Sequence, residues 1–304
     1  MTLTVGIVGH GEVGGIFGRG LLGKEGIAAI HAWDVRFADP ATGSAARAAA
    51  QADGLQAAQD MAALCAACNL IISAVTASNT FAVAEEAAKY VRPGTRFLDL
   101  NSASPGTKQR AAAVLEAAGA AYVEAGVMTS VPPYGIRVPM LLGGAQAEAL
   151  AATLAGWGMD ARTVSEKLGV ASAIKMSRSI MIKGLEALVI ESYATARHYG
   201  VEDHVLPTLA ETFPQIDWER QGAYFFSRVV QHGKRRAEEM REAAQTVQEA
   251  GFEPLMAEAT ADKQAWVSQL ARAGVFEGID PRHATWQDYA DRLLRQQADD
   301  GPAD

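Results

Sequence analysis

The sequence predicts an α/β domain with a mostly parallel sheet, followed by an all-helical domain that begins with a long helix. Two observations carry this prediction. Short apolar runs alternate with alanine-rich amphipathic stretches through the first half of the chain, whereas no convincing strand follows residue 169. Such alternation is typical of βαβ units with helices on both faces of a sheet. We place the boundary near Ser165, which gives domains at 1–165 and 166–304.

Apolar runs mark the expected strands, which lie at Leu3–Val8, Ile27–Trp33, Leu70–Val75, Arg96–Leu100, Ala120–Val123 and Val138–Leu142. Amphipathic stretches between them mark helices at about Val13–Gly23, Ser44–Ala52, Met61–Cys68, Thr80–Val91, Pro105–Ala118 and Gln146–Leu154. The long helix, Val170–Tyr199, lacks proline and stops at Gly200. Further helices are expected at Asp203–Thr212, Gly222–Ala250, Leu255–Ala273 and Arg282–Gln297, with Gly251 and Pro254 as stop signals after the second of these.

Composition excludes several classes of protein. With 304 residues, 49% of them hydrophobic and 20% charged, the chain is globular and long enough for two cores. The net charge of -8 and the lack of a long basic run argue against nucleic acid and anionic membranes as partners. No apolar run is long enough to span a membrane, and no signal peptide precedes Leu3, so we expect a cytoplasmic protein.

The chain has two cysteines, too few for a disulfide framework. They form Cys65-Ala66-Ala67-Cys68, a C-x-x-C pattern that could serve redox chemistry or bind a metal. The stretch is helical in character, however, and no second Cys/His pair lies nearby. We therefore favour two small residues that pack a helix, and we expect no metal site.

A glycine-rich turn follows the first expected strand and opens the first expected helix. Gly9-His10-Gly11-Glu12-Val13-Gly14 fits the pattern G-x-G-x-x-G. The first glycine permits a tight turn, the second lets the backbone approach a pyrophosphate, and the third lets helix and strand pack closely. Helix N-terminal N–H groups then meet the anion, so these six residues are predicted to bind a dinucleotide in a Rossmann-type domain. The alternative is a plain tight turn.

An acidic residue ends the second expected strand at the position where such domains contact the adenosine ribose. Asp34 lies twenty residues after Gly14 and could accept hydrogen bonds from the ribose hydroxyls of NAD, while repelling the 2′-phosphate of NADP. Arg36 could instead bind that phosphate. We predict NAD or NADP as cofactor and favour NAD, although Asp34 could also be a solvated turn residue.

A lysine lies early in the long helix, within Gly169-Val170-Ala171-Ser172-Ala173-Ile174-Lys175. Desolvation near the domain junction, or a neighbouring nicotinamide cation, would lower the pKa of Lys175 and make it a possible general base for an alcohol. By itself, a helical lysine is more often a solvated surface charge.

The chain resembles the β-hydroxyacid dehydrogenase superfamily, which includes 3-hydroxyisobutyrate and 6-phosphogluconate dehydrogenases. Four motifs in the same order carry the resemblance: the turn Gly9–Gly14; Asp99-Leu100-Asn101-Ser102-Ala103-Ser104-Pro105, similar to the D-x-S-T-x-x-P substrate loop; Gly135 to Gly143-Gly144, similar to a G…M-x-G-G hairpin; and Gly169–Lys175, which fits G-x-x-x-A-x-K. The resemblance covers nearly the whole chain and implies a Rossmann-type domain joined to an all-α domain by a long helix.

The resemblance also implies roles for single residues. Lys175 would be the general acid/base, and Asn101 and Ser102 would hold the substrate near the cofactor. Thr76, after the strand at Leu70–Val75, would lie near the nicotinamide ribose. The same loop can also be a helix N-terminus with Ser102 or Ser104 as the cap, and both roles can coexist. The family further implies a homodimer with a small-molecule substrate.

Several positions depart from the family pattern. Ser179 replaces the usual Asn four residues after the lysine, and Met128-Thr129-Ser130 replaces an S-G-G turn, which leaves Thr129, Ser130 and Ser179 as the expected substrate contacts. Ile182 occupies the place of the Glu acid of decarboxylating phosphogluconate enzymes, and Glu186 lies a further turn away. We therefore predict dehydrogenation of a small hydroxy acid without decarboxylation.

The segment that contains Arg235, Arg236, Glu238 and Glu239 replaces the family's later K-D motif. Together with Val131-Pro132-Pro133-Tyr134-Gly135, it resembles a branch labelled phosphogluconate dehydrogenase-like. The two arginines could bind an anionic substrate group or form a charged helix face with ion pairs to the two glutamates. Two alternative functions stay open: an imine reductase, which typically has Asp or Tyr in place of the lysine, and a dinucleotide-binding sensor without catalysis.

Overall fold

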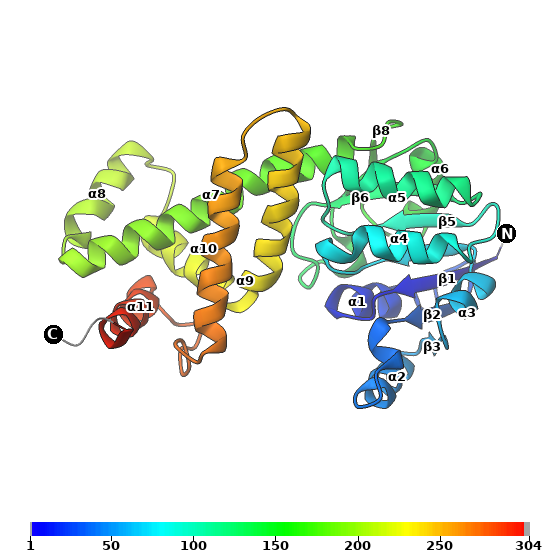
Figure 1. The fold of residues 1–304 in the computed structure, drawn as a ribbon, viewed down its shortest axis with the longest axis horizontal. Helices are drawn as coiled ribbons and strands as arrows, with labels where there is room; N and C mark the ends of the chain where they lie inside the picture. Colours follow the sequence, from blue (N-terminus) through cyan, green and yellow to red (C-terminus); the bar gives the residue numbers. More distant parts are fainter. Residues whose placement is uncertain (1, 301–304) are drawn as a thin grey trace. The chain divides into compact units, whose positions relative to one another are not determined.

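The computed structural model describes residues 2–300 and divides the chain into two compact units. Unit 1 comprises Met1–Ser177 together with Gln248–Gly251, and unit 2 comprises Arg178–Val247 and Phe252–Asp304. Figure 1 follows the elements of both units along the chain.

Unit 1 is built on a mostly parallel sheet, as the sequence predicts. Its strands, in chain order, are β1 (Leu3–Val8), β2 (Ile27–Trp33), β3 (Gln56–Ala57), β4 (Leu70–Ser73), β5 (Arg96–Asp99), β6 (Ala121–Val127), β7 (Met140–Gly143) and β8 (Ala161–Ser165). They lie side by side in the order β3-β2-β1-β4-β5-β6-β7-β8. Neighbouring strands are parallel except for the antiparallel pair of β6 and β7.

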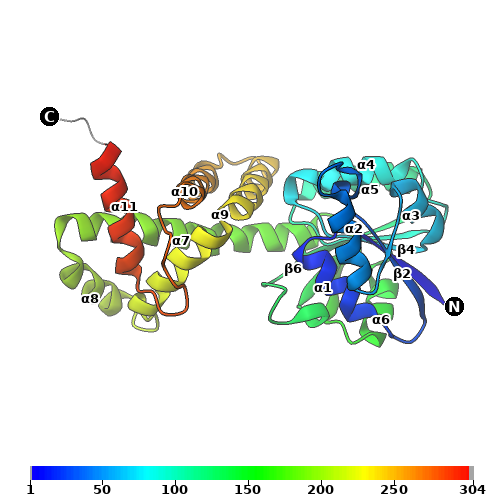
Figure 2. The same cartoon turned by 90° about the horizontal axis from the view of Figure 1, so that it is seen from below.

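Helices cover both faces of this sheet (Figure 2). In chain order they are α1 (Glu12–Leu21), α2 (Gly43–Ala52), α3 (Met61–Ala67), α4 (Thr80–Ala88), α5 (Pro105–Ala117) and α6 (Ala147–Gly156), with single 3-10 turns η1 (Val35–Ala38), η2 (Ala77–Asn79) and η3 (Gly135–Arg137). Because successive strand residues point to opposite faces, Ile7 packs with α1 and α6 in one core, whereas Val8 packs with α3, α4 and α5 in a second.

Two strands of unit 1 were not expected from the sequence, and one is longer than expected. β3 has only two residues, and β8 is a half-exposed edge strand in which polar and apolar residues are mixed. Neither strand contains an apolar run that could mark it in the sequence. β6 continues past Val123 to Val127 because Glu124 and Gly126, which interrupt the apolar pattern, are buried in the strand.

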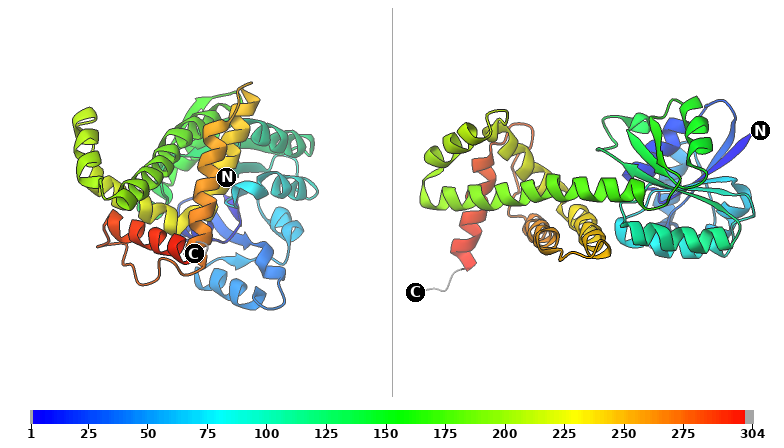
Figure 3. Two further views of the ribbon diagram at one scale, coloured as in Figure 1. Left: turned by 60° about the vertical axis from the view of Figure 1, so that its left-hand side comes forward. Right: turned by 90° about the horizontal axis from the view of Figure 1, so that it is seen from above.

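Unit 2 is all-helical, again as predicted. The long helix α7 (Val170–Tyr199) is followed by α8 (Glu202–Thr212), α9 (Trp218–Glu249), α10 (Leu255–Arg272) and α11 (Trp286–Asp300). Aromatic side chains dominate its core, where the Tyr193 ring lies 4.9 Å from the Trp286 ring. α9 and α10 run side by side (Figure 3), and Gly233 allows the close approach because a Cβ there would lie 2.7 Å from the Gln264 carbonyl.

The start of α7 belongs to unit 1, which extends beyond Ser165, the predicted end of the nucleotide-binding domain. The reason is a close packing of the helix on β6, where the position of a Cβ on Gly126 lies 2.9 Å from the Ala171 carbonyl oxygen. No helix in the described part of the chain has the length and apolarity that crossing a membrane requires.

Candidate active site

The glycine-rich turn joins β1 to α1 with the geometry that the sequence predicts. Gly9 adopts a positive φ of 90°, a conformation that favours glycine. A Cβ on Gly14 would overlap the Gly9 carbonyl, so this glycine lets the helix pack against the turn. Gly11 is the N-cap of α1, and a Cβ there would have nothing within 4 Å. The turn therefore leaves open space in front of the first helical amides, as a pyrophosphate requires.

Asp34 lies at the end of β2 beside this turn and is 7% exposed. Its carboxylate accepts hydrogen bonds from the His10 backbone N–H at 2.8 Å and from the Arg36 backbone N–H at 2.9 Å. The Arg36 guanidinium donates to both oxygens, also at 2.9 Å. Burial raises the pKa of Asp34, but the hydrogen bonds and charge of Arg36 outweigh burial, so that the pKa is held below its ordinary value.

The other predicted cofactor residues lie around the same strand ends. The His10 ring is 3.0 Å from Asp53, while Glu12 is exposed and Val13 partly buried at the start of α1. Thr76 follows β4, is exposed, and accepts a hydrogen bond from the Asn79 amide at 2.7 Å.

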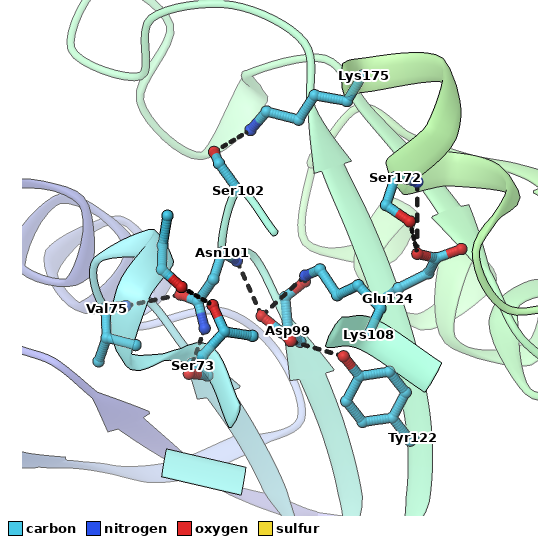
Figure 4. A network of polar contacts seen from close by, with 12 residues as sticks. Ser73, Val75, Asp99, Asn101, Ser102, Lys108, Tyr122, Glu124, Ser172 and Lys175 are labelled. Carbon is cyan, nitrogen blue, oxygen red and sulfur yellow. Dashed lines mark hydrogen bonds and ion pairs between the residues drawn. The ribbon is translucent and has the colours of Figure 1, made fainter. Parts of the chain in front are cut away.

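Lys175 and Ser102 are brought together although they are 73 residues apart. The Lys175 ammonium donates to the Ser102 hydroxyl oxygen at 2.5 Å (Figure 4). Ser102 lies in the loop after β5 and Lys175 in the second turn of α7, and both side chains are partly buried. The contact places a proton-carrying amine beside a hydroxyl at the carboxyl end of a parallel strand, which is where open α/β sheets bind ligands.

Asn101 is part of the same loop, but its side chain is turned into the protein. Its Oδ1 accepts from the Val75 N–H at 2.7 Å, and its Nδ2 donates to the Ser73 hydroxyl at 3.0 Å. Asn101 is 4% exposed and thereby ties the end of β4 to the end of β5 (Figure 4). The helix that follows is capped by Ser104, whose hydroxyl accepts from the Thr107 N–H, as one of the predicted interpretations of the loop requires.

A buried ion pair that sequence reasoning missed holds the base of this loop. Lys108 Nζ lies 2.9 Å from Asp99 Oδ1, and both side chains are 1% exposed. The Tyr122 hydroxyl donates to Asp99 Oδ2 at 2.6 Å, and the burial of this phenol raises its pKa well above the ordinary value. Only Asp99, at a strand end within the recognised motif, carried a signal in the sequence, because lysine is rarely buried.

Glu124 is a second buried carboxylate that sequence reasoning missed. It lies in β6 directly beside Asp99 in the strand register and is 0% exposed. Its oxygens accept hydrogen bonds from the start of α7, the helix that carries Lys175 (Figure 4). The signal that could have revealed it is a single charge inside the apolar run 120–127.

The predicted substrate residues of the neighbouring loop are accessible. Thr129 is exposed and Ser130 partly buried in the segment between β6 and β7. Ser179 belongs to the part of α7 assigned to unit 2 and is 8% exposed.

Arg235 and Arg236 differ from one another. The half-exposed Arg235 has its Nε 3.9 Å from Glu239 Oε1. This ion pair is the one expected if the segment is a charged helix face. Arg236 is 7% exposed and binds Glu186 of α7 instead of Glu238, with its Nε 3.0 Å from Glu186 Oε2. Its side chain is therefore part of the interior of unit 2 and does not belong to a solvated face.

Cys65 and Cys68 are both buried, and burial raises the pKa of their thiols to about 11 and about 12. These values oppose redox or metal chemistry, because both reactions use the thiolate. Among the side chains that the structure describes, residues 2–296, no cluster of three or more His, Cys, Asp or Glu is arranged to hold a metal ion.

Comparison with known proteins shows which families and solved structures the chain resembles. Residues 4–153 match the family described as the NAD binding domain of 6-phosphogluconate dehydrogenase, and residues 196–267 match a domain of unknown function. A conserved hypothetical protein from Sinorhizobium meliloti is 36% identical, with 97% of each chain covered and a TM-score of 0.76. Protein MTH1747, described as structurally similar to 3-hydroxyacid dehydrogenases, is 26% identical over 89% of this chain and 98% of its own, with a TM-score of 0.67.

The fold recurs in the 3-hydroxyisobutyrate dehydrogenase of Mycobacterium tuberculosis, which was solved with L-serine. That protein is 14% identical over 96% of this chain and 99% of its own, with a TM-score of 0.64, so the likeness concerns the fold alone. The nucleotide-binding half indicates a nicotinamide dinucleotide as the cofactor. With this half followed by a helical unit, and with a full-length relative at 36% identity, the chain belongs to the β-hydroxyacid dehydrogenase superfamily.

Proposed function

We propose that this protein is an NAD(P)-dependent oxidoreductase that acts on the CH–OH group of a small hydroxy acid, with Lys175 as the general acid/base. The observation that carries the proposal is the 2.5 Å contact between Lys175 Nζ and Ser102 Oγ at the carboxyl end of the sheet. A surface lysine would have no reason to be held against the loop that follows β5, whereas an acid/base must be fixed close to its substrate.

The proposed proton transfer uses the Lys175 amine, which this hydrogen bond holds beside Ser102. In oxidation, the neutral amine of Lys175 takes the proton of the substrate hydroxyl, and in reduction the ammonium returns it to the alkoxide. The bound nicotinamide supplies the chemistry of accepting or donating a hydride. Because Ser102 accepts from Lys175, its own hydroxyl proton can be donated to a substrate oxygen.

The residues of the turn fit the expected cofactor. Open space in front of Gly11, together with the uncapped first amides of α1, suits a pyrophosphate, so we assign Gly9–Gly14 to the dinucleotide. Asp34 supports a preference for NAD over NADP, since a carboxylate with a lowered pKa is charged at neutral pH and repels a 2′-phosphate. We assign Thr76 to the nicotinamide ribose.

The substrate is expected to be a small molecule held by Ser102, Thr129 and Ser130 of unit 1, with Asn101 acting through the position of the loop. Ser179, which the sequence also suggests, is 8% exposed in unit 2 and is left out of this proposal. We further propose a cytoplasmic homodimer that does not decarboxylate its product.

A screen of hydroxy acids and polyols with both cofactors, followed at the nicotinamide absorbance, tests the activity. With the best substrate found, Lys175→Ala should lower kcat about a hundred- to ten-thousandfold and leave the affinity for the cofactor unchanged. Lys175→Arg should also be poor, since a guanidinium keeps its proton. Lys167→Ala is the matched control, because this nearby lysine is exposed in the segment before α7.

Retention of more than about a third of kcat in Lys175→Ala would remove this residue from the mechanism, because a general acid/base contributes far more than that. Turnover of imines without turnover of hydroxy acids would favour the imine reductase alternative. Cofactor binding without turnover of either class would favour the sensor.

A further inference from the structure

The carboxylate of Glu124 is surrounded by hydrogen-bond donors from the first turn of α7. Oε1 accepts from the Gly169 N–H at 2.7 Å and from the Ala171 N–H at 3.1 Å. Oε2 accepts from the Ser172 N–H at 3.3 Å and from the Ser172 hydroxyl at 2.7 Å. Glu124 is 0% exposed, so these four donors replace the water that a buried carboxylate has lost.

These contacts have a plain physical reason. The first N–H groups of an α-helix have no partner within the helix, and the N-terminal end of the helix dipole attracts negative charge. Backbone N–H groups can only donate, so an ionised carboxylate satisfies them, whereas an amide in its place would direct an NH₂ group at some of them. The position of the helix start is thereby set by a residue of the neighbouring strand.

The strand also contacts the helix two residues further on. Gly126 lies on the same face of β6, and a Cβ there would be 2.9 Å from the Ala171 carbonyl oxygen and 3.5 Å from Lys175 Cβ. The backbone of α7 at Lys175 is therefore packed directly on β6. Glu124 fixes this helix along and around its axis, while Gly126 fixes its distance from the sheet.

We propose that Glu124 is a positioning residue for Lys175. The inference rests on the proposed role of Lys175 as acid/base and adds the group that holds it in place. By fixing residues 169–172, Glu124 determines where the next turn of α7 presents the Lys175 ammonium, and hence the 2.5 Å contact with Ser102. The partner of Glu124 in the strand register, Asp99, holds the other side of that contact through the base of the Ser102 loop.

The test is Glu124→Gln, measured with the hydroxy acid that the screen identifies and with saturating NAD. We expect kcat per folded molecule to fall about ten- to hundredfold, the loss typical of a misplaced catalytic group, with KM for NAD unchanged. Glu124→Asp, which keeps the charge on a shorter side chain, should recover part of the loss. Glu116→Gln, at an exposed carboxylate of α5, is the matched control.

A double mutant separates positioning from a general structural role. Because Glu124 acts through Lys175, Glu124→Gln in the Lys175→Ala background should cause no further loss of kcat. Losses that add in the double mutant would overturn the proposal. Normal turnover in Glu124→Gln beside an impaired Lys175→Ala would overturn the positioning role alone, whereas normal turnover in Lys175→Ala would overturn the acid/base role itself.

Amide hydrogen exchange provides a readout that needs no substrate. Glu124→Gln should speed exchange at residues 169–172 and leave the rest of the sheet protected. If Glu124→Gln does not fold, Ser172→Ala replaces it, because this variant removes one donor and keeps the carboxylate with three backbone partners. It should show faster local exchange with a fall in kcat of a few fold. Unchanged exchange and unchanged kcat would contradict the inference.

Discussion

Arg36 binds the carboxylate of Asp34 with two nitrogens of its guanidinium, each 2.9 Å from a different oxygen. The pair lies beside the turn Gly9–Gly14, and its arginine is half-exposed while its aspartate is buried. Asp34, which we propose favours NAD, therefore forms an ion pair with Arg36, the residue that could bind the 2′-phosphate of NADP. Each determines how far the other is available to a cofactor.

Asp34→Ser should shift the preference toward NADP. The substitution removes the repulsive charge and frees the Arg36 guanidinium for a phosphate, so the ratio of kcat/KM for NADP over NAD should rise about tenfold or more. Arg36→Gln in the same background should reverse the gain. Asp39→Ser, at an exposed aspartate nearby, is the control and should leave the ratio unchanged. A wild-type enzyme that already prefers NADP would contradict the role given to Asp34.

Alanine substitutions at two glycines of the turn should have different effects. Gly14→Ala should lower the thermal midpoint of unfolding, because its Cβ would overlap the Gly9 carbonyl. Gly11→Ala should leave the midpoint unchanged, since a Cβ there meets nothing within 4 Å, but it should weaken cofactor binding by entering the space reserved for the pyrophosphate. Calorimetry and cofactor titration distinguish the two effects. Equal cofactor affinity in Gly11→Ala and wild type would argue against dinucleotide binding at this turn.

Oxidation of a β-hydroxy acid should yield the β-keto acid without release of carbon dioxide. Ile182 cannot donate a proton, and Glu186 is 2% exposed and engaged by Arg236 and Gln264. A substrate labelled with ¹³C in its carboxylate measures the released carbon dioxide against the reduced cofactor. Release in step with reduction would assign the missing acid to another residue of this chain.

The two thiols should be unreactive in the native protein. With pKa values of about 11 and about 12, Cys65 and Cys68 carry almost no thiolate at pH 8, and both are buried. Ellman's reagent should therefore label neither cysteine at pH 8 until guanidinium chloride unfolds the chain, when both react. Rapid labelling of the folded protein would restore the redox interpretation of the C-x-x-C pattern.

The architecture of both units could be predicted from the sequence because hydrophobic periodicity is strong in the central strands and long helices. β1 is an apolar run that ends at a glycine turn, and α7 extends without proline to Gly200, so the bounds predicted for both agree with the structure. β8 could not be predicted from hydrophobic periodicity, because an edge strand needs few apolar residues. β6 was cut short at Glu124, since periodicity gives no sign that a charge can be buried against a helix start.

The candidate site was only partly predictable for a similar reason. The motif that contains Ser102 and the motif that contains Lys175 could be recognised separately, and the structure brings these two residues together. The sequence could not show that Asn101 turns inward to Ser73 and Val75. Asn101 and Ser102 are adjacent polar residues of one loop, and the sequence does not indicate which of the two side chains points into the protein. Lys108 carried no signal at all, since its burial depends on Asp99 and on the fold around it.

The register pairing of Asp99 with Glu124 has a consequence for engineering this protein. Asp99 and Glu124 lie within the sheet. The segment 128–139, which contains Thr129 and Ser130, is instead a connection between β6 and β7. Libraries that vary this connection can therefore be built and selected for new alcohols while Lys175 and Ser102, the pair proposed for proton transfer, keep their scaffold. In such a library, the varied segment 128–139 would determine which substrate is accepted, and the unchanged sheet would maintain the geometry that catalysis requires.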